Sequence, residues 1–311
     1  MKLKITIILL FISINAFSQN RLWTTGTART IPKGDVELSM FYFSKYGLTQ
    51  YFEIQSKPLW WIKYPNLNGK ITWYYHKGQV HKNFLRSRDY LIGSIHGFNY
   101  PTWALRTTQR KGYLGGIIPP EAIIPSIFAF RNEILFTTII KKQKTCYNSN
   151  FLLTLKLGHK IALKTSEATL PYFDNALYNR ESAIYRNLSL YYAGIDLDGK
   201  LSYGLNYTVD LDFYSVGINT DHWSLEHKGL VYWKMGHRER VRVVVGYKLA
   251  YSNYTTIKGS ISPFVDFTYM FHPRSNKHTQ LFRNGVNKNR DIRDMFYKKE
   301  KKEKKEKKEK E

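Results

Sequence analysis

The sequence predicts an all-β fold, a single antiparallel transmembrane β-barrel of about twelve strands. Three observations lead to this prediction: long alternating segments, an export signal at the N-terminus, and no run of eighteen apolar residues after Gln19. The clearest segment is "LSYGLNYTVDLDFY", residues 201–214, in which every second residue is apolar or aromatic. The residues between are small, polar or acidic. Such alternation is typical of a strand whose two faces meet different surroundings.

Residues 1–18 have the order of a secretory signal peptide. Lys2 and Lys4 precede the apolar run "ITIILLFISI", and Ala16 and Ser18 occupy the −3 and −1 positions of a cleavage site. The apolar run is shorter than the ~20 residues that a spanning helix needs, which favours cleavage over an N-terminal anchor. We therefore expect residues 1–18 to be removed on export, residues 19–272 to form the barrel, and residues 273–311 to form a basic Lys/Glu-rich tail.

Twelve segments qualify as strands. Eleven alternate or are rich in β-forming residues: 35–43, 48–56, 68–76, 88–99, 127–141, 149–163, 187–198, 200–214, 223–235, 238–251 and 259–272. The weaker segment 21–30 is included because a barrel with both termini in the periplasm needs an even number of strands. Ten strands is the alternative count. The connections alternate between long and short, as outside loops and periplasmic turns do, whereas a soluble secreted sandwich predicts shorter strands.

Composition agrees with export. Cys146 is the only cysteine, so no internal disulfide can form, and 24 Tyr, 18 Phe and 7 Trp are available for interfacial girdles. The net charge is +24, and part of it lies in the terminal KKE repeat, which we expect to be disordered and solvated or to bind a periplasmic partner. Export and the lack of a nucleic-acid motif argue against nucleic acid as a partner.

Three stretches near the N-terminus are similar to a known group of proteins. They are "TARTIPKG", "YGLTQYFEI" and "PLWWIKYPNLNGK", at residues 27–34, 46–54 and 58–70. The segment that contains them resembles the opening of a group of outer-membrane β-barrel proteins from Bacteroidetes-type bacteria. The resemblance implies a location in the bacterial outer membrane and a barrel architecture. It implies no substrate, because the group brings no assigned chemistry to individual residues.

Alternation also predicts which polar side chains line the lumen. They are Asn206, Thr208, Asp210, Asp212, Glu226, Lys228, Lys234, Arg242 and Lys248. A barrel of ~8 strands is filled by side chains and one of 16 strands leaves an open channel, so twelve strands predict a partly occluded lumen. The leading interpretation is a narrow channel or transport-type barrel for small solutes, without cofactor or metal. Its expected surroundings are outer-membrane lipid and lipopolysaccharide, and a structural envelope protein is an alternative.

A second alternative is a hydrolase at the outer mouth, with Asp210, Asp212 and His222 as candidate catalytic residues. A carboxylate that orients a histidine is sound general-base chemistry, and the grouping resembles in kind the acid–His sites of outer-membrane barrel proteases. The spacing departs from that pattern, and a hydrated barrel wall explains the same residues. No G-x-S-x-G motif marks a serine nucleophile. We expect the long loop 100–126 to pack over the outer mouth, with a gating plug as the other interpretation.

Overall fold

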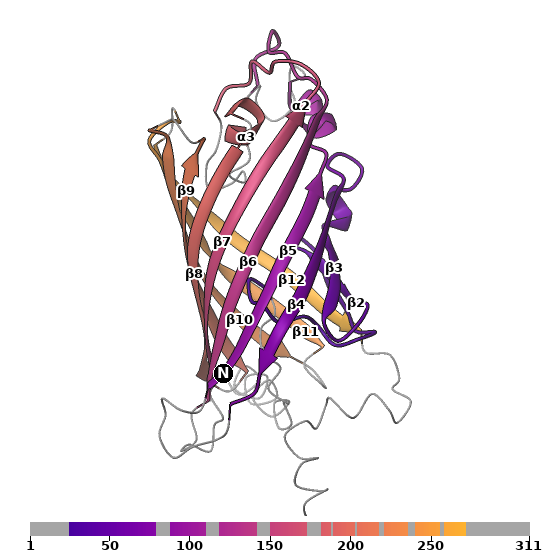
Figure 1. The fold of residues 1–311 in the computed structure, drawn as a ribbon, viewed down its shortest axis with the longest axis vertical. Helices are drawn as coiled ribbons and strands as arrows, with labels where there is room; N and C mark the ends of the chain where they lie inside the picture. The colour runs from indigo at the N-terminus through magenta and orange to yellow at the C-terminus, as the bar shows by residue number, and fades with distance from the viewer. Residues whose placement is uncertain are drawn as a thin grey trace, which may run out of the picture. The chain divides into compact units, whose positions relative to one another are not determined.

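The protein forms a closed barrel of twelve antiparallel strands (Figure 1). The computed structural model describes residues 25–78, 88–109, 118–141, 150–172, 182–187, 189–202, 204–217, 221–235, 240–255 and 258–271. The strands are β1 (Val36–Ser39), β2 (Ser44–Gly47), β3 (Phe52–Ser56), β4 (Asn66–His76), β5 (Arg88–Asn99), β6 (Ile127–Lys141), β7 (Asn150–Lys164), β8 (Ser189–Ser202), β9 (Leu205–Val216), β10 (Trp223–Met235), β11 (Val241–Ser252) and β12 (Gly259–Phe271). The predicted all-β fold and the count of twelve are confirmed.

The first strands differ from the prediction. Residues 25–30 form turns and irregular chain, and the predicted strand 35–43 is replaced by the two short strands β1 and β2. The count of twelve was therefore reached with one wrong strand and one missed strand. β1 closes the barrel against the end of β12, where Leu38 lies opposite Tyr269. The predicted signal peptide 1–18 and the tail 273–311 lie outside the described residues.

The two faces of the strands differ as a period of two requires. On β9, Thr208, Asp210 and Asp212 are buried in the interior, while Leu211 and Phe213 between and beyond them are exposed on the outer face. The same alternation runs through β6 to β12, whose exposed residues include Ile134, Leu157, Val245, Val265 and Phe267. The barrel is thus apolar outside and largely polar inside, with an interior apolar cluster of Ala28, Leu91, Ile95, Leu135, Ile139 and Leu152.

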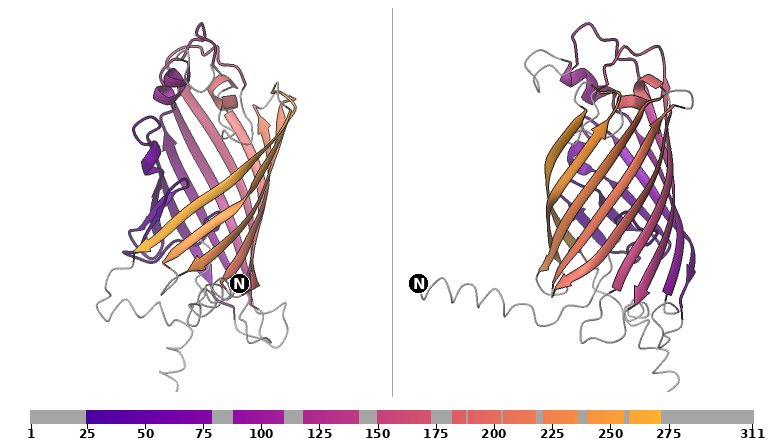
Figure 2. Two further views of the ribbon diagram at one scale, coloured as in Figure 1. Left: turned by 180° about the vertical axis from the view of Figure 1, so that it is seen from behind. Right: turned by 90° about the vertical axis from the view of Figure 1, so that its left-hand side faces the viewer.

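One end of the barrel is covered by its longer connections. Helices α2 (Thr102–Thr108) and α3 (Ser182–Asn187) both lie at this end, which we call the capped end (Figures 1 and 2). An apolar cluster joins them to the strand ends: Leu105, Ile118, Ile124, Ile127, Leu170, Ile184, Leu190 and Val216. The described part of loop 100–126 therefore packs over the mouth, as expected. Among the described residues, no helix has the length and hydropathy needed to cross a bilayer.

Candidate functional site

The predicted lumen residues lie on the neighbouring strands β9, β10 and β11. Five of them form one ion-pair network: Asp210, Asp212, Glu226, Lys228 and Lys248. Thr208, Asp210, Asp212, Glu226, Lys234 and Arg242 are buried, and Asn206, Lys228 and Lys248 are partly buried. Lys228 on β10 contacts Asp210 across the strand pair and lies 3.5 Å from Glu226, which in turn lies 3.0 Å from Lys248. The charges of this wall are therefore paired with one another rather than open to a passage.

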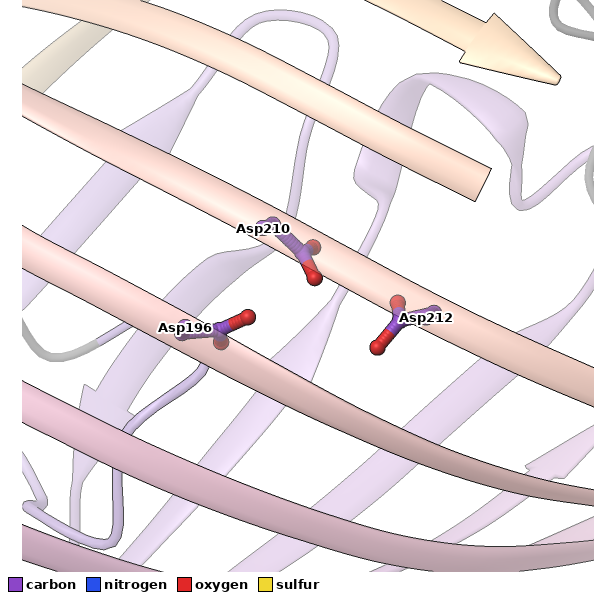
Figure 3. Close-up of side chains that lie close together, drawn as sticks. All are labelled: Asp196, Asp210 and Asp212. Carbon is purple, nitrogen blue, oxygen red and sulfur yellow. The ribbon is translucent and has the colours of Figure 1, made fainter. Parts of the chain in front are cut away.

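Three aspartates form the centre of the network. Asp196 on β8 and Asp210 and Asp212 on β9 point toward one another, with one oxygen of each within 4.8 Å of the others (Figure 3). Such a group of carboxylates is a common metal-binding arrangement. Here the Nζ atom of Lys156 on β7 lies 2.7 Å from an oxygen of each of the three. The ammonium group holds the place that a cation would take, so we assign these residues, the interior acid cluster, to electrostatic pairing within the wall.

A glycine permits Lys156 to reach the cluster. Lys156 lies opposite Gly194, and Gly194 lies opposite Asp212 on the next strand. A Cβ atom at position 194 would overlap Asp212 Oδ1 and would lie 2.8 Å from Lys156 Cε. The missing side chain thus leaves the space through which the lysine crosses β8.

Further ion pairs extend the network around the interior. Lys45 lies 3.0 Å from Glu37, and Arg242 reaches the same carboxylate at 3.5 Å. Lys70 and Glu53 lie 3.3 Å apart, and both side chains are fully buried. Arg131, Glu133 and Tyr192 form a further hydrogen-bonded group. Buried ions need partners, because an unpaired charge away from water is costly, and these pairs meet that need around the barrel.

The N-terminal segment 25–31 runs through the interior, and we call it the lumen segment. Its backbone is held at Ala28, whose N–H donates to Thr137 Oγ1 at 2.8 Å and whose carbonyl accepts from Thr72 Oγ1 at 2.6 Å. The Ile31 N–H donates to Glu53 Oε2 at 2.6 Å. Gly26 lies against the Asp196 carboxylate, with no room for a Cβ atom. Its contacts therefore join β3, β4, β6 and β8 from inside.

The lumen segment is the main difference between the predicted and the observed interior. Thr27 and Ala28 have no exposed surface, and Ile31 is 1% exposed. The barrel wall and this segment together bury charged side chains such as Lys70, Glu53 and Glu133 almost completely. The lumen segment thus occupies part of the described interior, alongside β3, β4, β6 and β8. Among the described residues, the chain inside the barrel is this segment, whereas the described part of loop 100–126 packs at the mouth.

The candidate catalytic residues are not brought together. The His222 ring packs against Tyr172 and Tyr254 near the capped end, with ring centroids 5.6 and 5.3 Å away. Asp210 and Asp212 pair with Lys156 and Lys228 instead. Among the described residues, no hydrogen bond or ion pair joins His222 to either carboxylate. His222 therefore takes part in aromatic packing at the mouth, and Asp210 and Asp212 take part in ion pairs with lysines inside the barrel.

Several residues of the network were missed at the sequence level, although a signal for them exists. Thr154 and Lys156 alternate with leucines in "NFLLTLKLGHK", and Asp196 and Asp198 alternate with Ile195 and Leu197 in "LYYAGIDLDGK". The alternation used to place the polar residues of 201–214 in the lumen would have placed these four residues inside as well. That Lys156 meets three carboxylates depends on strand register, which alternation does not give.

Comparison with known proteins adds no assignment to this geometry. No family model matches the chain, and no curated protein matches it.

Proposed function

We propose that the protein is an outer-membrane β-barrel whose polar lumen is closed at rest by the lumen segment, and that it acts as a gated, transport-type barrel for small solutes. The observation that carries the proposal is the division between an apolar outer face and a charged, internally plugged lumen. A transport role requires a path that opens, and the lumen segment is the part of the chain that would have to leave the path.

Strand length and exposure support the location. β6 to β12 have 12 to 15 residues each, against the ~9–11 residues that span a bilayer in a barrel. Their exposed outer residues are apolar, including Ile134 at 61% and Leu157 at 64% exposure. An apolar outer face with a polar lumen is the pattern of membrane barrels. In a soluble protein, so wide an apolar surface is an aggregation hazard.

The predicted environment follows from this location. The capped end faces outward, where its loops meet lipopolysaccharide, and the opposite end faces the periplasm, where the basic tail meets any partner it has. Export through the predicted signal peptide is part of the same proposal. No cofactor or metal enters it, because the acidic cluster is already paired with Lys156.

Single-channel conductance in a planar bilayer tests the proposal. The intact protein should be nearly silent, and a variant without residues 25–31 should show discrete openings. A double variant, Thr72→Val with Thr137→Val, removes the two side-chain hydrogen bonds to Ala28. If the deletion variant does not fold, this double variant is recorded in its place and should also show openings. Folding is checked by the gel shift that barrels show on heating.

Two results would overturn the proposal. Steady conductance of the intact protein would mean that the lumen segment is no seal. Silence from folded, inserted variants that lack its contacts would remove transport and leave the structural envelope role.

A further inference from the structure

A chain of hydrogen bonds lies on the outer face of β4, β5 and β6. The Trp73 indole N–H lies 2.7 Å from Ser94 Oγ, Ser94 Oγ lies 3.0 Å from His96 Nε2, and His96 Nδ1 lies 2.9 Å from Asn132 Oδ1. We call these four residues the outer relay. Ser94 and His96 are two residues apart on β5 and so share one face, and Asn132 lies directly opposite His96 on β6.

One arrangement of protons satisfies all three contacts of the outer relay. The Trp73 indole can only donate, so Ser94 Oγ accepts from it and its own hydrogen is directed to His96 Nε2. Asn132 Oδ1 can only accept, so the hydrogen of the imidazole lies on Nδ1. Nε2 is then the free base facing the hydroxyl. A nucleophile, a base and a third group that orients the base are the parts of an activated serine.

From this geometry we infer that the outer relay is a serine hydrolase site for acyl esters of membrane lipids, with Ser94 as nucleophile, His96 as general base and Asn132 as the residue that positions His96. The inference rests on the proposed membrane location. It is separate from transport, because the relay lies on the outer face and its hydrogen bonds join only its own four residues. It also differs from the predicted Asp/His site at the mouth.

The surroundings identify the substrate class. Ser94 lies between Ile71 on β4 and Ile134 on β6, and Ile92 and Phe136 are exposed on the same face. An acyl chain packs well on such a surface. Two residues beyond His96, Phe98 begins an aromatic group that includes Phe128, Tyr100 and Trp103. Aromatic groups of this kind lie at the headgroup level of a membrane, so lipid esters would meet the relay just below it.

Ser94 is buried on the outer face, and the exposed Trp73 side chain is bonded to it. Ser94 is 4% exposed, whereas Trp73, which covers it, is 63% exposed. The strand register shifts between Thr72 and Tyr74, so Trp73 lies at a β-bulge, an irregularity that is common beside active sites. We expect the Trp73 ring to move aside when the ester carbonyl binds, which frees its N–H to donate to the developing oxyanion.

The reaction balances without a cofactor. Ser94 Oγ bonds to the acyl carbon as its proton passes to His96 Nε2, and the ester C–O bond breaks as that proton passes to the leaving alcohol. Water then attacks the acyl-serine, giving one proton to His96, and the acid leaves as the proton returns to Ser94. Asn132 accepts the Nδ1 hydrogen throughout and stabilises the imidazolium in both steps.

The test uses the full mature chain in phospholipid vesicles, with and without lipopolysaccharide, and measures released fatty acid. We expect release by the intact protein, with Ser94→Ala and His96→Ala lowering it about 10²–10⁴-fold. Ser215→Ala, an outer-face serine on β9, is the matched control and should keep full activity. The two vesicle types separate phospholipid from lipopolysaccharide as the source of the acyl group.

Two further measurements keep the inference testable. A fluorophosphonate probe, which loses fluoride to an activated serine, should modify Ser94 and should fail to do so in His96→Ala. Asn132→Asp keeps an acceptor for Nδ1 and should retain more activity than Asn132→Leu at equal vesicle insertion. Heat-shifted, inserted protein with neither fatty-acid release nor a Ser94 adduct would overturn the site. Failure to insert would instead count against the membrane location.

Discussion

The interior acid cluster and the outer relay hold similar side-chain types in opposite surroundings. In the cluster, Lys156 lies 2.7 Å from each of three aspartates, so the three carboxylates share one counter-ion. In the relay, hydrogen bonds run from the Trp73 indole through Ser94 and His96 to Asn132, and no carboxylate or ammonium group takes part among these four side chains. The difference teaches that the residue types expected of a catalytic site are weak evidence until their partners are known. The predicted catalytic acids, Asp210 and Asp212, form ion pairs within the barrel wall. The hydroxyl and imidazole of the proposed hydrolase site, Ser94 and His96, lie on the outer face.

The largest expected effect comes from Lys156→Met. The variant leaves three buried carboxylates without their shared counter-ion, and we expect the free energy of unfolding to fall by about 3–5 kcal/mol. Urea midpoints of refolded protein measure this. The exposed Lys33→Met is the charge-matched control, and His96→Leu in the relay should leave the midpoint nearly unchanged. If Lys156→Met is as stable as the intact protein, the cluster is not held together by the lysine.

Next in size is the effect of a charge on the outer face. Leu211 is 45% exposed on β9, between the interior Asp210 and Asp212. Leu211→Arg should lower stability in lipid by about 2–4 kcal/mol, because the charge would lie in hydrocarbon. Leu211→Met controls for the altered packing, and Asn206→Arg places the same charge at a partly buried lumen position near the strand end. Similar midpoints for the two arginine variants would mean that β9 has no lipid side.

Gly194→Val should have a smaller effect on the cluster. The new side chain would occupy the space through which Lys156 crosses β8, and overpacking of this kind costs about 1–3 kcal/mol. At Gly259 an added Cβ would meet no atom within 4 Å, so Gly259→Val is the matched control. Thermal unfolding in detergent compares the two. Equal melting temperatures would show that the cluster repacks without loss.

The smallest effect concerns the lumen segment. Thr72→Val and Thr137→Val each remove one hydrogen bond to Ala28 while preserving shape, and Thr137→Val also removes the bond to Thr154. Each lost bond costs about 1 kcal/mol. Both should increase the frequency of brief openings in bilayer recordings. Thr154→Val removes a bond within the wall, to Thr137, and should cost stability without openings. An equal rise in openings for Thr154→Val would point to general loosening of the barrel.

The sequence predicted the wall of the barrel well, for a physical reason. A strand with different surroundings on its two faces must alternate, and "LSYGLNYTVDLDFY" alternates. The predicted strand 200–214 is wrong at its start, because Leu201 and Ser202 end β8, Gly204 lies in a turn, and β9 begins at Leu205. The same parity places Asp210 and Asp212 on the interior face. Alternation carries no information on what a side chain meets across the barrel, which is why Lys156 was not expected as the shared partner of three aspartates.

Alternation of apolar and polar residues could not predict the lumen segment or the outer relay. Residues 25–31 are short, polar and rich in threonine, a composition that suits both a weak edge strand and a chain held inside a polar lumen. Ser94 and His96 are visible in "GSIHGF", but their partners Trp73 and Asn132 come from neighbouring strands through register and a β-bulge. Sequence spacing alone does not determine either feature.

The central claim is that the apolar outer face of the barrel meets lipid. Reconstituting the protein in vesicles whose acyl chains carry a photoactivated diazirine, and mapping the adducts by mass spectrometry, tests this most directly. We expect adducts at exposed outer residues such as Leu157, Leu211, Val245 and Val265, and none at interior Thr154 or Thr208. Adducts spread equally over both faces, or absent from the strands, would contradict it.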